Sequence, residues 1–405
     1  MYILSTPAIY ALEITSACHN RCPGCSNIYD SYRVGAVTDA DTWTRWLAVI
    51  GPHAVQIRLT GGEPTLHPGF LRILQAATSY NAWVTVFTNG RWQQPQTLVA
   101  ALAQMPRLSG LLVSLHGASA RQHEEFTGVP GSFDETMANI RLARSAGVQV
   151  ALSTVITRQN WRDLAAVVDL GQELDVQHVA FNRYLGEPAP NIEPDEAQQR
   201  EACDEIERLI ETGAAAKYGI GLPQCFMVNA SEGCLAGVAY AAIDPWGRLH
   251  PCVHSPSIIG TLHEQSLADL WHSSAMATWR NLMPVECTGC AAYSVCHGGC
   301  RAVQELRPDY RDPLRRSALT SFARNEEVRA LPAEGRPTLH GTLRPESFGY
   351  VVLGGGQLLP VRAEAQLLLI ACDGTSTFSA LAEQFGQPGL ELLGDLWERG
   401  LLQIN

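Results

Sequence analysis

The sequence predicts an α/β protein with a partial (β/α)6 TIM-like barrel, then a Cys-rich region and a small C-terminal domain. Three observations predict this. Apolar strand patterns alternate with helical patterns six times before residue 190, seven of the 12 cysteines lie between 225 and 300, and a short strand–helix pattern begins near 345. With 46% hydrophobic and 17% charged residues among 405, the chain has enough apolar surface to bury a core.

Each barrel unit is predicted from a short apolar run followed by an amphipathic stretch. Because the two patterns alternate, we expect parallel strands joined by crossover helices, with chemistry at the C-terminal ends of the strands. The predicted strands are 9–15, 54–60, 82–88, 111–116, 149–156 and 177–182, and the predicted helices are 40–50, 69–79, 95–105, 133–146 and 161–174.

The net charge and the N-terminal residues limit the class of protein and its expected cellular compartment. The formal net charge of −11, from 29 Lys and Arg against 40 Asp and Glu, disfavours a nucleic-acid binder. The first seven residues lack a basic region, and no apolar stretch reaches the roughly 18 residues of a membrane span. We therefore expect a cytoplasmic protein without a membrane segment. In that reducing compartment, the cysteines are expected to bind metal and not to form disulfides.

Three cysteines follow the first predicted strand directly. Cys18, Cys22 and Cys25 form a CxxxCxxC run. Three thiolates on one loop can each hold one iron of a 4Fe–4S cluster, which leaves the fourth iron open to a ligand. On spacing alone, a zinc site with His19 as fourth ligand is the alternative.

This run resembles the signature of the radical SAM superfamily, and further similar segments follow in order at successive strand ends. The segment Thr60-Gly61-Gly62-Glu63-Pro64 is similar to the family's GGEP motif, in which two glycines let the backbone approach and carbonyl and carboxylate groups face an ammonium. The other residues that the resemblance assigns to S-adenosylmethionine binding are Asn89, Ser114, His116 and Ser153. The resemblance makes Cys18, Cys22 and Cys25 the ligands of the catalytic cluster.

One residue departs from the family pattern. The position before the third cysteine, usually aromatic in the family, is Gly24 here. Packing against the adenine is therefore expected from Trp83, Phe87 or Tyr184. The implied chemistry is reductive cleavage of S-adenosylmethionine, followed by abstraction of a hydrogen atom from the substrate. The sequence does not identify a general acid or base.

The Cys-rich region has its own spacing. Cys234 and Cys252 flank Gly247, and a C-x2-C-x5-C-x3-C run follows later. Pairs of the CxxC type are also common in zinc sites, which is the alternative on spacing alone. The whole pattern resembles the SPASM extension of radical SAM enzymes, which implies two auxiliary iron–sulfur clusters. By resemblance, the first uses Cys225, Cys234, Cys252 and Cys300, and the second uses Cys287, Cys290 and Cys296.

The fourth ligand of the second cluster is missing from the pattern. After Cys300 the only cysteine is Cys372, in the terminal domain. We therefore expect a carboxylate ligand, Asp312 or the nearby Asp309, or an open iron. Cys372 and the isolated Cys203 are expected to be buried structural thiols.

The last 60 residues or so resemble the PqqD-like winged-helix fold, the recognition element for precursor peptides. Strands are predicted at 349–353 and 357–361, and helices near 363–372, 376–386 and 389–399, with Thr375 or Ser376 as a cap. In that family the leader peptide adds a strand to the sheet edge. DNA binding is the alternative, but residues 345–405 contain seven Asp and Glu against two Arg.

Together these features predict five segments and one function. The segments are a radical SAM partial barrel (1–190), a linker and bridging helix (191–225), a SPASM domain (226–322), a second linker (323–344) and a PqqD-like domain (345–405). The expected function is radical modification of a ribosomally made precursor peptide, giving a thioether or C–C crosslink, with a flavodoxin- or ferredoxin-type reductant. Epimerisation and decarboxylation stay open. The alternatives are a small-molecule substrate such as a tetrapyrrole, a folded protein such as a sulfatase, or a non-enzymatic metal-stapled binding protein.

Overall fold

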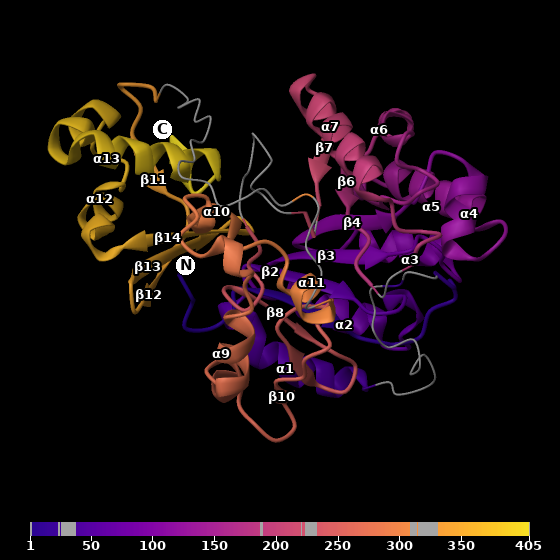
Figure 1. Ribbon diagram of the computed structural model, residues 1–405. Helices are drawn as coiled ribbons and strands as arrows, with labels where there is room; N and C mark the ends of the chain where they lie inside the picture. Colours follow the sequence, from indigo (N-terminus) through magenta and orange to yellow (C-terminus); the bar gives the residue numbers. More distant parts are fainter. Residues whose placement is uncertain are drawn as a thin grey trace.

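The computed structural model describes residues 2–22, 25, 38–186, 189–219, 221–222, 233–307, 314 and 331–404. Its centre is a ten-stranded sheet with the order β10-β9-β8-β1-β2-β3-β4-β5-β6-β7 (Figure 1). Strands β10 and β7 are the two ends of this order, so the described sheet is an open, partial barrel.

The six predicted barrel strands are confirmed, and all pair in parallel. Shared register places the residues at their C-terminal ends side by side, as Glu13 with Thr60 and Ser114 with Ser153. The strands are β1 (Ile9–Glu13), β2 (Gln56–Thr60), β3 (Trp83–Thr88), β4 (Leu108–Ser114), β5 (Val150–Val155) and β6 (Val179–Asn182).

The five predicted barrel helices are also confirmed, and the structure adds α4. The sequence of α4 is rich in charged and polar residues, which hides its short apolar stripe at Phe126; Ser119 caps it by accepting the N–H of Gln122 at 3.4 Å. The helices are α1 (Ala40–Ile50), α2 (Phe70–Thr78), α3 (Pro95–Leu102), α4 (Ala120–Thr127), α5 (Ser132–Ser145), α6 (Leu164–Glu173) and α7 (Glu196–Glu211).

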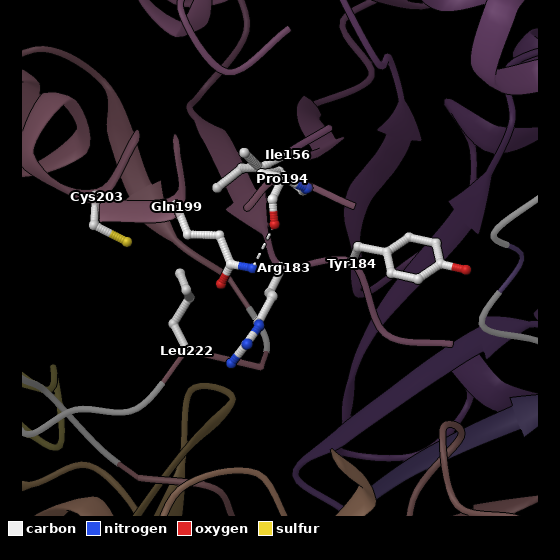
Figure 2. A pocket seen from close by; sticks show the side chains of 7 residues that line it. All are labelled: Ile156, Arg183, Tyr184, Pro194, Gln199, Cys203 and Leu222. Carbon is white, nitrogen blue, oxygen red and sulfur yellow. Dashed lines mark hydrogen bonds between the residues drawn. The ribbon is translucent and has the colours of Figure 1, made fainter. Parts of the chain in front are cut away.

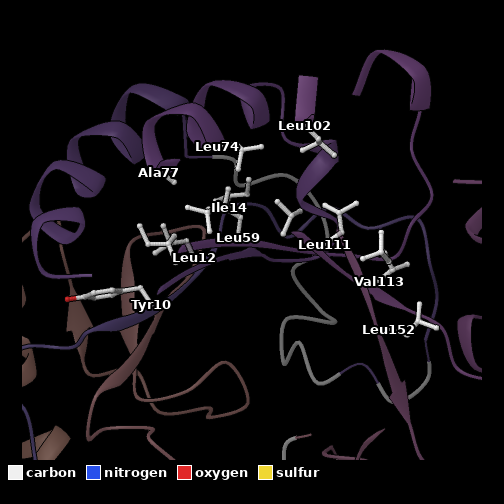
Figure 3. Close-up of a cluster of buried hydrophobic side chains, with 14 of the residues drawn as sticks. Tyr10, Leu12, Ile14, Leu59, Leu74, Ala77, Leu102, Leu111, Val113 and Leu152 are labelled. Carbon is white, nitrogen blue, oxygen red and sulfur yellow. The ribbon is translucent and has the colours of Figure 1, made fainter. Parts of the chain in front are cut away.

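The main core lies between the sheet and these helices. Alternate residues of β1, including Tyr10 and Leu12, point towards the helices and pack with Leu59 and Leu74 (Figure 3). The other residues of β1, such as Ile9 and Ala11, belong to a second cluster on the opposite face. Because the side chains alternate, the face opposite to the helices is the inner face of the barrel.

The sheet continues beyond the expected barrel boundary at residue 190. Strand β7 (Ala216–Tyr218) pairs with β6, and β8 (Tyr240–Ile243) pairs in parallel with β1. The Cys-rich region is thereby joined to the barrel through backbone hydrogen bonds. Its remaining elements are β9 (Arg248–His250), β10 (Gly260–Thr261), α8 (Leu267–Trp271), α9 (Ser274–Arg280), η5 (Val285–Cys287), α10 (Tyr293–Cys296) and α11 (Arg301–Leu306).

The C-terminal unit has a three-stranded antiparallel sheet with the order β12-β13-β14, followed by helices. Strand β12 lies mostly in the expected linker, and Gly386 interrupts α13. The expected cap at Thr375 or Ser376 is wrong, because the side chain of Thr377 accepts the N–H of Ala380. The elements are β11 (Pro337–Leu339), β12 (Thr342–Glu346), β13 (Gly349–Gly354), β14 (Gln357–Arg362), η6 (Ala363–Ala365), α12 (Gln366–Ala371), α13 (Phe378–Glu398) and β15 (Leu402–Ile404).

The turn between β13 and β14 packs against the N-terminal ends of the barrel strands. The carbonyl of Gly356 accepts a hydrogen bond from Gln56, at the start of β2. A Cβ on Gly356 would lie 3.1 Å from the ring of Trp83, at the start of β3. Trp83 is thus at the end of the barrel opposite to Cys18, so the expectation that it packs against adenine is wrong.

The N-terminal segment also contacts the C-terminal unit, and the N-terminus lies beside it in Figure 1. The carboxylate of Glu346 accepts the backbone N–H of Ser5 at 2.6 Å, and Arg344 donates to the carbonyl of Thr6 at 3.0 Å. Among the described residues, no helix is both long and apolar enough to cross a lipid bilayer.

Candidate functional site

The cysteine loop begins five residues after β1 ends. Within it, the N–H of Cys25 donates to the carbonyl of Cys22 at 3.2 Å, which closes a turn between the two thiols. The N–H of Arg21 donates to the carbonyl of Thr127 at the end of α4, at 2.7 Å. The loop is therefore fixed both internally and from a neighbouring helix.

The Thr60–Pro64 segment lies directly against the chain that leads into Cys18. The N–H of Gly62 donates to Thr15 and that of Glu63 donates to Ala17, both at 2.7 Å. A Cβ on Gly61 would lie 2.3 Å from the carbonyl oxygen of Thr15. In this structure, the two glycines therefore allow two protein backbones to approach each other, in addition to any role towards a ligand.

The carboxylate of Glu63 is fully buried and accepts four hydrogen bonds. Burial raises the pKa of Glu63, and the hydrogen-bond donors offset only part of this increase. Three of these bonds go to Oε1 and one goes to Oε2, which fixes the carboxylate in place, and the backbone carbonyls of the segment are further acceptors for an ammonium. The donors are Thr65 N (3.2 Å), Thr65 Oγ1 (2.6 Å), Thr88 Oγ1 (2.9 Å) and Asn89 N (2.8 Å).

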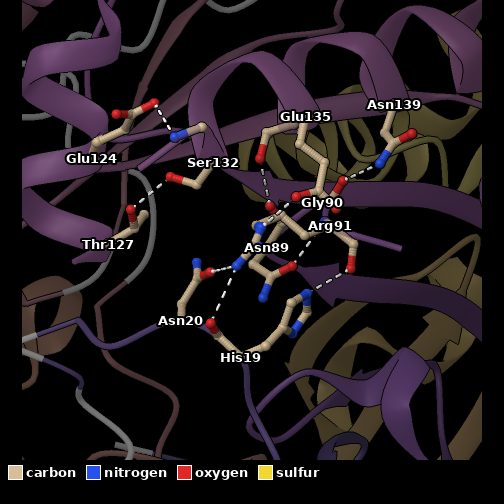
Figure 4. A network of polar contacts seen from close by, with 12 residues as sticks. His19, Asn20, Asn89, Gly90, Arg91, Glu124, Thr127, Ser132, Glu135 and Asn139 are labelled. Atoms are coloured by element: carbon tan, nitrogen blue, oxygen red, sulfur yellow. Dashed lines mark hydrogen bonds and ion pairs between the residues drawn. The ribbon is translucent and has the colours of Figure 1, made fainter. Parts of the chain in front are cut away.

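Asn89 connects β3 to the cysteine loop. Its side-chain amide lies 3.9 Å from the sulfur of Cys18, and its side-chain oxygen accepts the N–H of Arg91 at 2.8 Å. Helix α5 supports this turn, because Thr136 donates to the carbonyl of Asn89 and Asn139 to that of Gly90. Figure 4 shows Asn139 donating to Gly90, next to Asn89 and Arg91 in this turn.

Two buried histidines lie behind β4. The ring nitrogen Nδ1 of His116 accepts the backbone N–H of Val155 at 3.3 Å. The backbone N–H of His116 donates to Nδ1 of His123 at 3.2 Å. The backbone donors identify Nε2 as the protonated nitrogen of each ring. Burial lowers the pKa of both, that of His123 to about 4, so both are neutral at pH 7.

Polar side chains line the C-terminal ends of the next strands. Ser114 and Ser153 are neighbours in register, and Asn182 donates to the hydroxyl of Ser153 at 2.9 Å. The expected residues Thr60, Asn89, Ser114, His116 and Ser153 thus all lie at the strand ends that also carry the cysteine loop.

Three cysteines of the Cys-rich region come together although they are far apart in sequence. Burial raises the pKa of Cys252 well above its usual value, and the nearby thiols of Cys234 and Cys300 raise it further. Burial, followed by the charge of Cys234, raises the pKa of Cys300 to about 11. Bound iron removes this penalty because it replaces the thiol protons, so the three thiols fit a cluster.

The other three cysteines lie on a compact segment. Cys287 ends η5 and Cys296 ends α10, while the N–H of Cys290 donates to the carbonyl of Cys287 at 3.3 Å. Gly289 between them has a φ of 75°, which favours glycine. The turn repeats the contact between Cys25 and Cys22.

Within the described ranges, no three His, Cys, Asp or Glu side chains converge as the ligands of a single ion do. A cubane cluster binds each thiolate at a different iron atom, so its ligands need not converge. The expected ligands Cys225 and Asp312, together with Asp309 and Gly24, lie outside the described residues. Cys203 and Cys372 are buried as expected, and Cys372 belongs to the core of the C-terminal unit.

Two buried charged residues near the site were missed. Glu13 ends β1 and is close enough to Cys252 and Tyr240 to raise the pKa of both groups. Arg183 follows β6, and its charge lowers the pKa of Cys300. Figure 2 shows Arg183 and Tyr184 among the residues that line a small pocket, with their side chains pointing in different directions. The sequence signal that could have identified Glu13 and Arg183 is a charged residue at the end of an apolar strand.

Comparison with known proteins agrees with this geometry. Residues 12–171 match the Radical SAM superfamily, and residues 234–300 match SPASM, an iron–sulfur cluster-binding domain. Two relatives are similar along most of their length. The AdoMet-dependent heme synthase of Methanosarcina barkeri (strain Fusaro / DSM 804) is 26% identical over 331 residues (74% of this chain, 92% of the relative). The PqqA peptide cyclase of Gluconobacter oxydans (strain 621H) is 26% identical over 317 residues (74% and 87%).

Solved structures share the fold. Streptococcus suis SuiB bound to the precursor peptide SuiA superposes with a TM-score of 0.63 at 20% identity, covering 76% of this chain and 75% of that chain. Native anSMEcpe with bound AdoMet gives 0.58 at 16% identity, covering 75% and 92%. At these identities the likeness concerns the fold alone.

The two domain matches and the cysteine geometry define the class: a radical SAM enzyme. More specifically, the protein is a radical SAM/SPASM enzyme, whose cofactors are S-adenosylmethionine, a 4Fe–4S cluster and auxiliary iron–sulfur clusters. The zinc-scaffold alternative is not favoured.

Proposed function

We propose that the protein modifies a ribosomally made precursor peptide by radical chemistry and forms a thioether or C–C crosslink. The single observation that carries the peptide substrate is the C-terminal unit: a three-stranded antiparallel sheet followed by helical segments that pack on one face of the sheet. This order of elements resembles that of a PqqD-like winged-helix domain, which supports the proposal. The relatives named as PqqA peptide cyclases support the same substrate class.

The edge of β14 is the proposed binding edge for the leader peptide. The other edge strand, β12, is engaged with the N-terminal segment through Arg344 and Glu346. In the register of the β13–β14 hairpin, Pro360 pairs with Val351 at a position where an N–H would face away from β13. A strand added at this edge would therefore find backbone carbonyl groups as acceptors. It would lack one backbone N–H donor, because Pro360 has none.

The chemistry is divided between cofactor and chain. When bound, the cluster and S-adenosylmethionine supply, after one-electron reduction, a 5′-deoxyadenosyl radical that takes a hydrogen atom from the substrate. In our proposal, Cys18, Cys22 and Cys25 hold the cluster, and backbone carbonyls of Gly61–Glu63 receive the amine of S-adenosylmethionine. Asn89, Ser114, His116 and Ser153 surround its remaining polar groups.

The auxiliary clusters complete the proposed electron balance. Crosslinking removes one hydrogen atom from the first carbon, then one proton and one electron when the second bond forms. We propose that the cluster held by Cys234, Cys252 and Cys300, with Cys225, accepts this electron. A second cluster at Cys287, Cys290 and Cys296, with Asp312 as its further ligand, passes it towards a flavodoxin- or ferredoxin-type partner.

A second candidate is modification of a tetrapyrrole. It is favoured by the heme synthase relative, which matches as long a part of this chain as the peptide cyclase does. The C-terminal unit has no evident role towards such a small molecule, which is why the peptide is the first proposal.

The test uses the full chain, purified and reconstituted without oxygen. The enzyme is incubated with S-adenosylmethionine, dithionite and a synthetic candidate precursor peptide that carries a leader-like sequence, and the products are analysed by mass spectrometry. The proposal expects 5′-deoxyadenosine and a peptide that has lost two hydrogen atoms. Turnover of an iron-free porphyrin precursor in place of the peptide would support the second candidate. An unchanged peptide beside abundant 5′-deoxyadenosine would contradict the choice of substrate.

A further inference from the structure

Arg91 makes several side-chain contacts beside the cysteine loop, and no motif includes it. Its guanidinium donates through Nη1 to the carbonyl of His19 at 3.2 Å and to the side-chain oxygen of Asn20 at 2.9 Å. In return, Nε2 of His19 lies 2.9 Å from the carbonyl of Arg91. These contacts hold the main chain between Cys18 and Cys22 from one side (Figure 4).

Arg91 forms an ion pair in which the positive group contacts the cysteine loop and the negative group lies farther from it. Nε of Arg91 pairs with Glu135 of α5 at 2.7 Å, and the guanidinium is 15% exposed while the carboxylate is 40% exposed. The cation thus touches the loop, and the anion lies behind it towards solvent. Because solvent screens the exposed charge more strongly, the net effect at the loop is positive.

Arg91 also orients the donor that faces Cys18. Its backbone N–H donates to the side-chain oxygen of Asn89, which turns the Asn89 amide nitrogen towards the Cys18 sulfur. Hydrogen bonds to the sulfurs and nearby positive charge both stabilise the reduced form of an iron–sulfur cluster, because that form carries the larger negative charge.

We propose that Arg91 is a positioning residue for the radical SAM cluster: its side chain fixes the loop between Cys18 and Cys22 and raises the midpoint potential of the cluster. The inference rests on the cluster of the radical SAM domain and is independent of the substrate. Its consequence is that a physiological reductant of modest strength suffices for the first electron transfer.

The decisive test compares two substitutions with opposite expected signs. Arg91→Gln removes the proximal cation, so the midpoint potential should fall. Glu135→Gln removes the distal anion, so the potential should rise, by a smaller amount. Arg91→Lys keeps the charge and should stay close to wild type. The potential is read from an EPR-monitored redox titration in the presence of S-adenosylhomocysteine, following the signal that this ligand perturbs.

Arg144→Gln is the matched control. Arg144 also pairs with a carboxylate, that of Asp175, but it lies at the other end of α5, about 14 Å from Glu135 along the helix axis. Its substitution should leave the potential unchanged. Amide hydrogen exchange of the iron-free protein provides a separate readout, in which Arg91→Gln should speed exchange in residues 18–22 and Arg144→Gln should not.

The outcomes separate this inference from the proposed function. If the wild-type protein binds no iron at Cys18, Cys22 and Cys25, the proposed function itself fails. If the cluster assembles and the Arg91 and Glu135 variants keep the wild-type potential, or shift it in the same direction, the positioning role of Arg91 is overturned.

Discussion

The backbone N–H of Gly62 donates to the carbonyl oxygen of Thr15 at 2.7 Å, and this contact joins the GGEP segment to the chain that enters the cysteine loop. The chain that leads into the proposed ligand Cys18 and the segment that is proposed to meet S-adenosylmethionine are thus joined by backbone hydrogen bonds. Glu63 extends this connection to β3 through Thr88 and Asn89. A change in any of these segments is therefore expected to affect iron binding as well as cofactor binding.

Gly62→Ala tests the close approach of the two backbones. A Cβ at this position would lie 2.3 Å from the carbonyl oxygen of Ala17, so one segment must move. We expect a loss of about 1–3 kcal/mol in the free energy of unfolding and weaker iron binding at the first cysteine loop. Gly394→Ala is the control, since nothing lies within 4 Å of its Cβ position and its φ is not positive. Equal iron content in both variants would contradict the argument.

Glu63→Gln tests the buried carboxylate. The substitution replaces one acceptor oxygen by a donor that faces existing donors, which should cost about 1–3 kcal/mol. Calorimetry should show weaker binding of S-adenosylmethionine, because the Asn89 turn loses its anchor. Glu124→Gln, at an exposed carboxylate that accepts the N–H of Gly131, should change neither property. Wild-type affinity in Glu63→Gln would count against the anchoring role.

Cysteine substitutions test which cluster each thiol holds. Cys22→Ala should lose about four iron atoms per chain and all 5′-deoxyadenosine formation. Cys252→Ala should also lose about four iron atoms, yet still release 5′-deoxyadenosine without forming product. Cys203→Ala, at a buried thiol, is the control and should keep the full iron content. Loss of iron in this control would mean that the ligand assignment is incomplete.

His123 predicts a specific pH dependence. Burial lowers the pKa of its ring to about 4 from the usual 6.5, so the unfolded chain binds this proton first as pH falls. The contribution of the neutral His123 ring to the free energy of unfolding is fully present above pH 6.5 and is lost between pH 6.5 and 4. From pH 7 to 5.5, wild type should lose about 1.2 kcal/mol more than His123→Asn, which keeps an acceptor for the backbone N–H of His116. Chemical denaturation at the two pH values measures this difference, and parallel pH profiles would refute it.

The barrel and the cysteine ligands were predictable because they depend on local patterns. Alternating apolar runs specify the six strands, and thiol spacing specifies the loops. Helix α4 was missed because its buried side includes polar residues, Gln122 and His123, that pair with groups outside the helix. Strand β12 was missed because it contains Pro345 and lies at an edge, where proline is tolerated.

The contacts between distant segments could not be predicted from spacing. Trp83 reads as a candidate for adenine packing until the fold places it at the start of β3, beside Gly356. Likewise, nothing in the sequence around Arg91 indicates that its guanidinium contacts His19 and Asn20, which are 71 or more residues away. Such relationships depend on strand order and on helix α5.

The central claim is that the three groups of cysteines hold iron–sulfur clusters and that the first one cleaves S-adenosylmethionine. The most direct test is anaerobic reconstitution, followed by counting of iron and sulfide and incubation with S-adenosylmethionine and dithionite. Three clusters predict about twelve iron atoms per chain and release of 5′-deoxyadenosine. About eight iron atoms per chain, with release of 5′-deoxyadenosine, would mean that the protein holds only one auxiliary cluster. Zinc in place of iron, with no 5′-deoxyadenosine, would contradict the account as a whole.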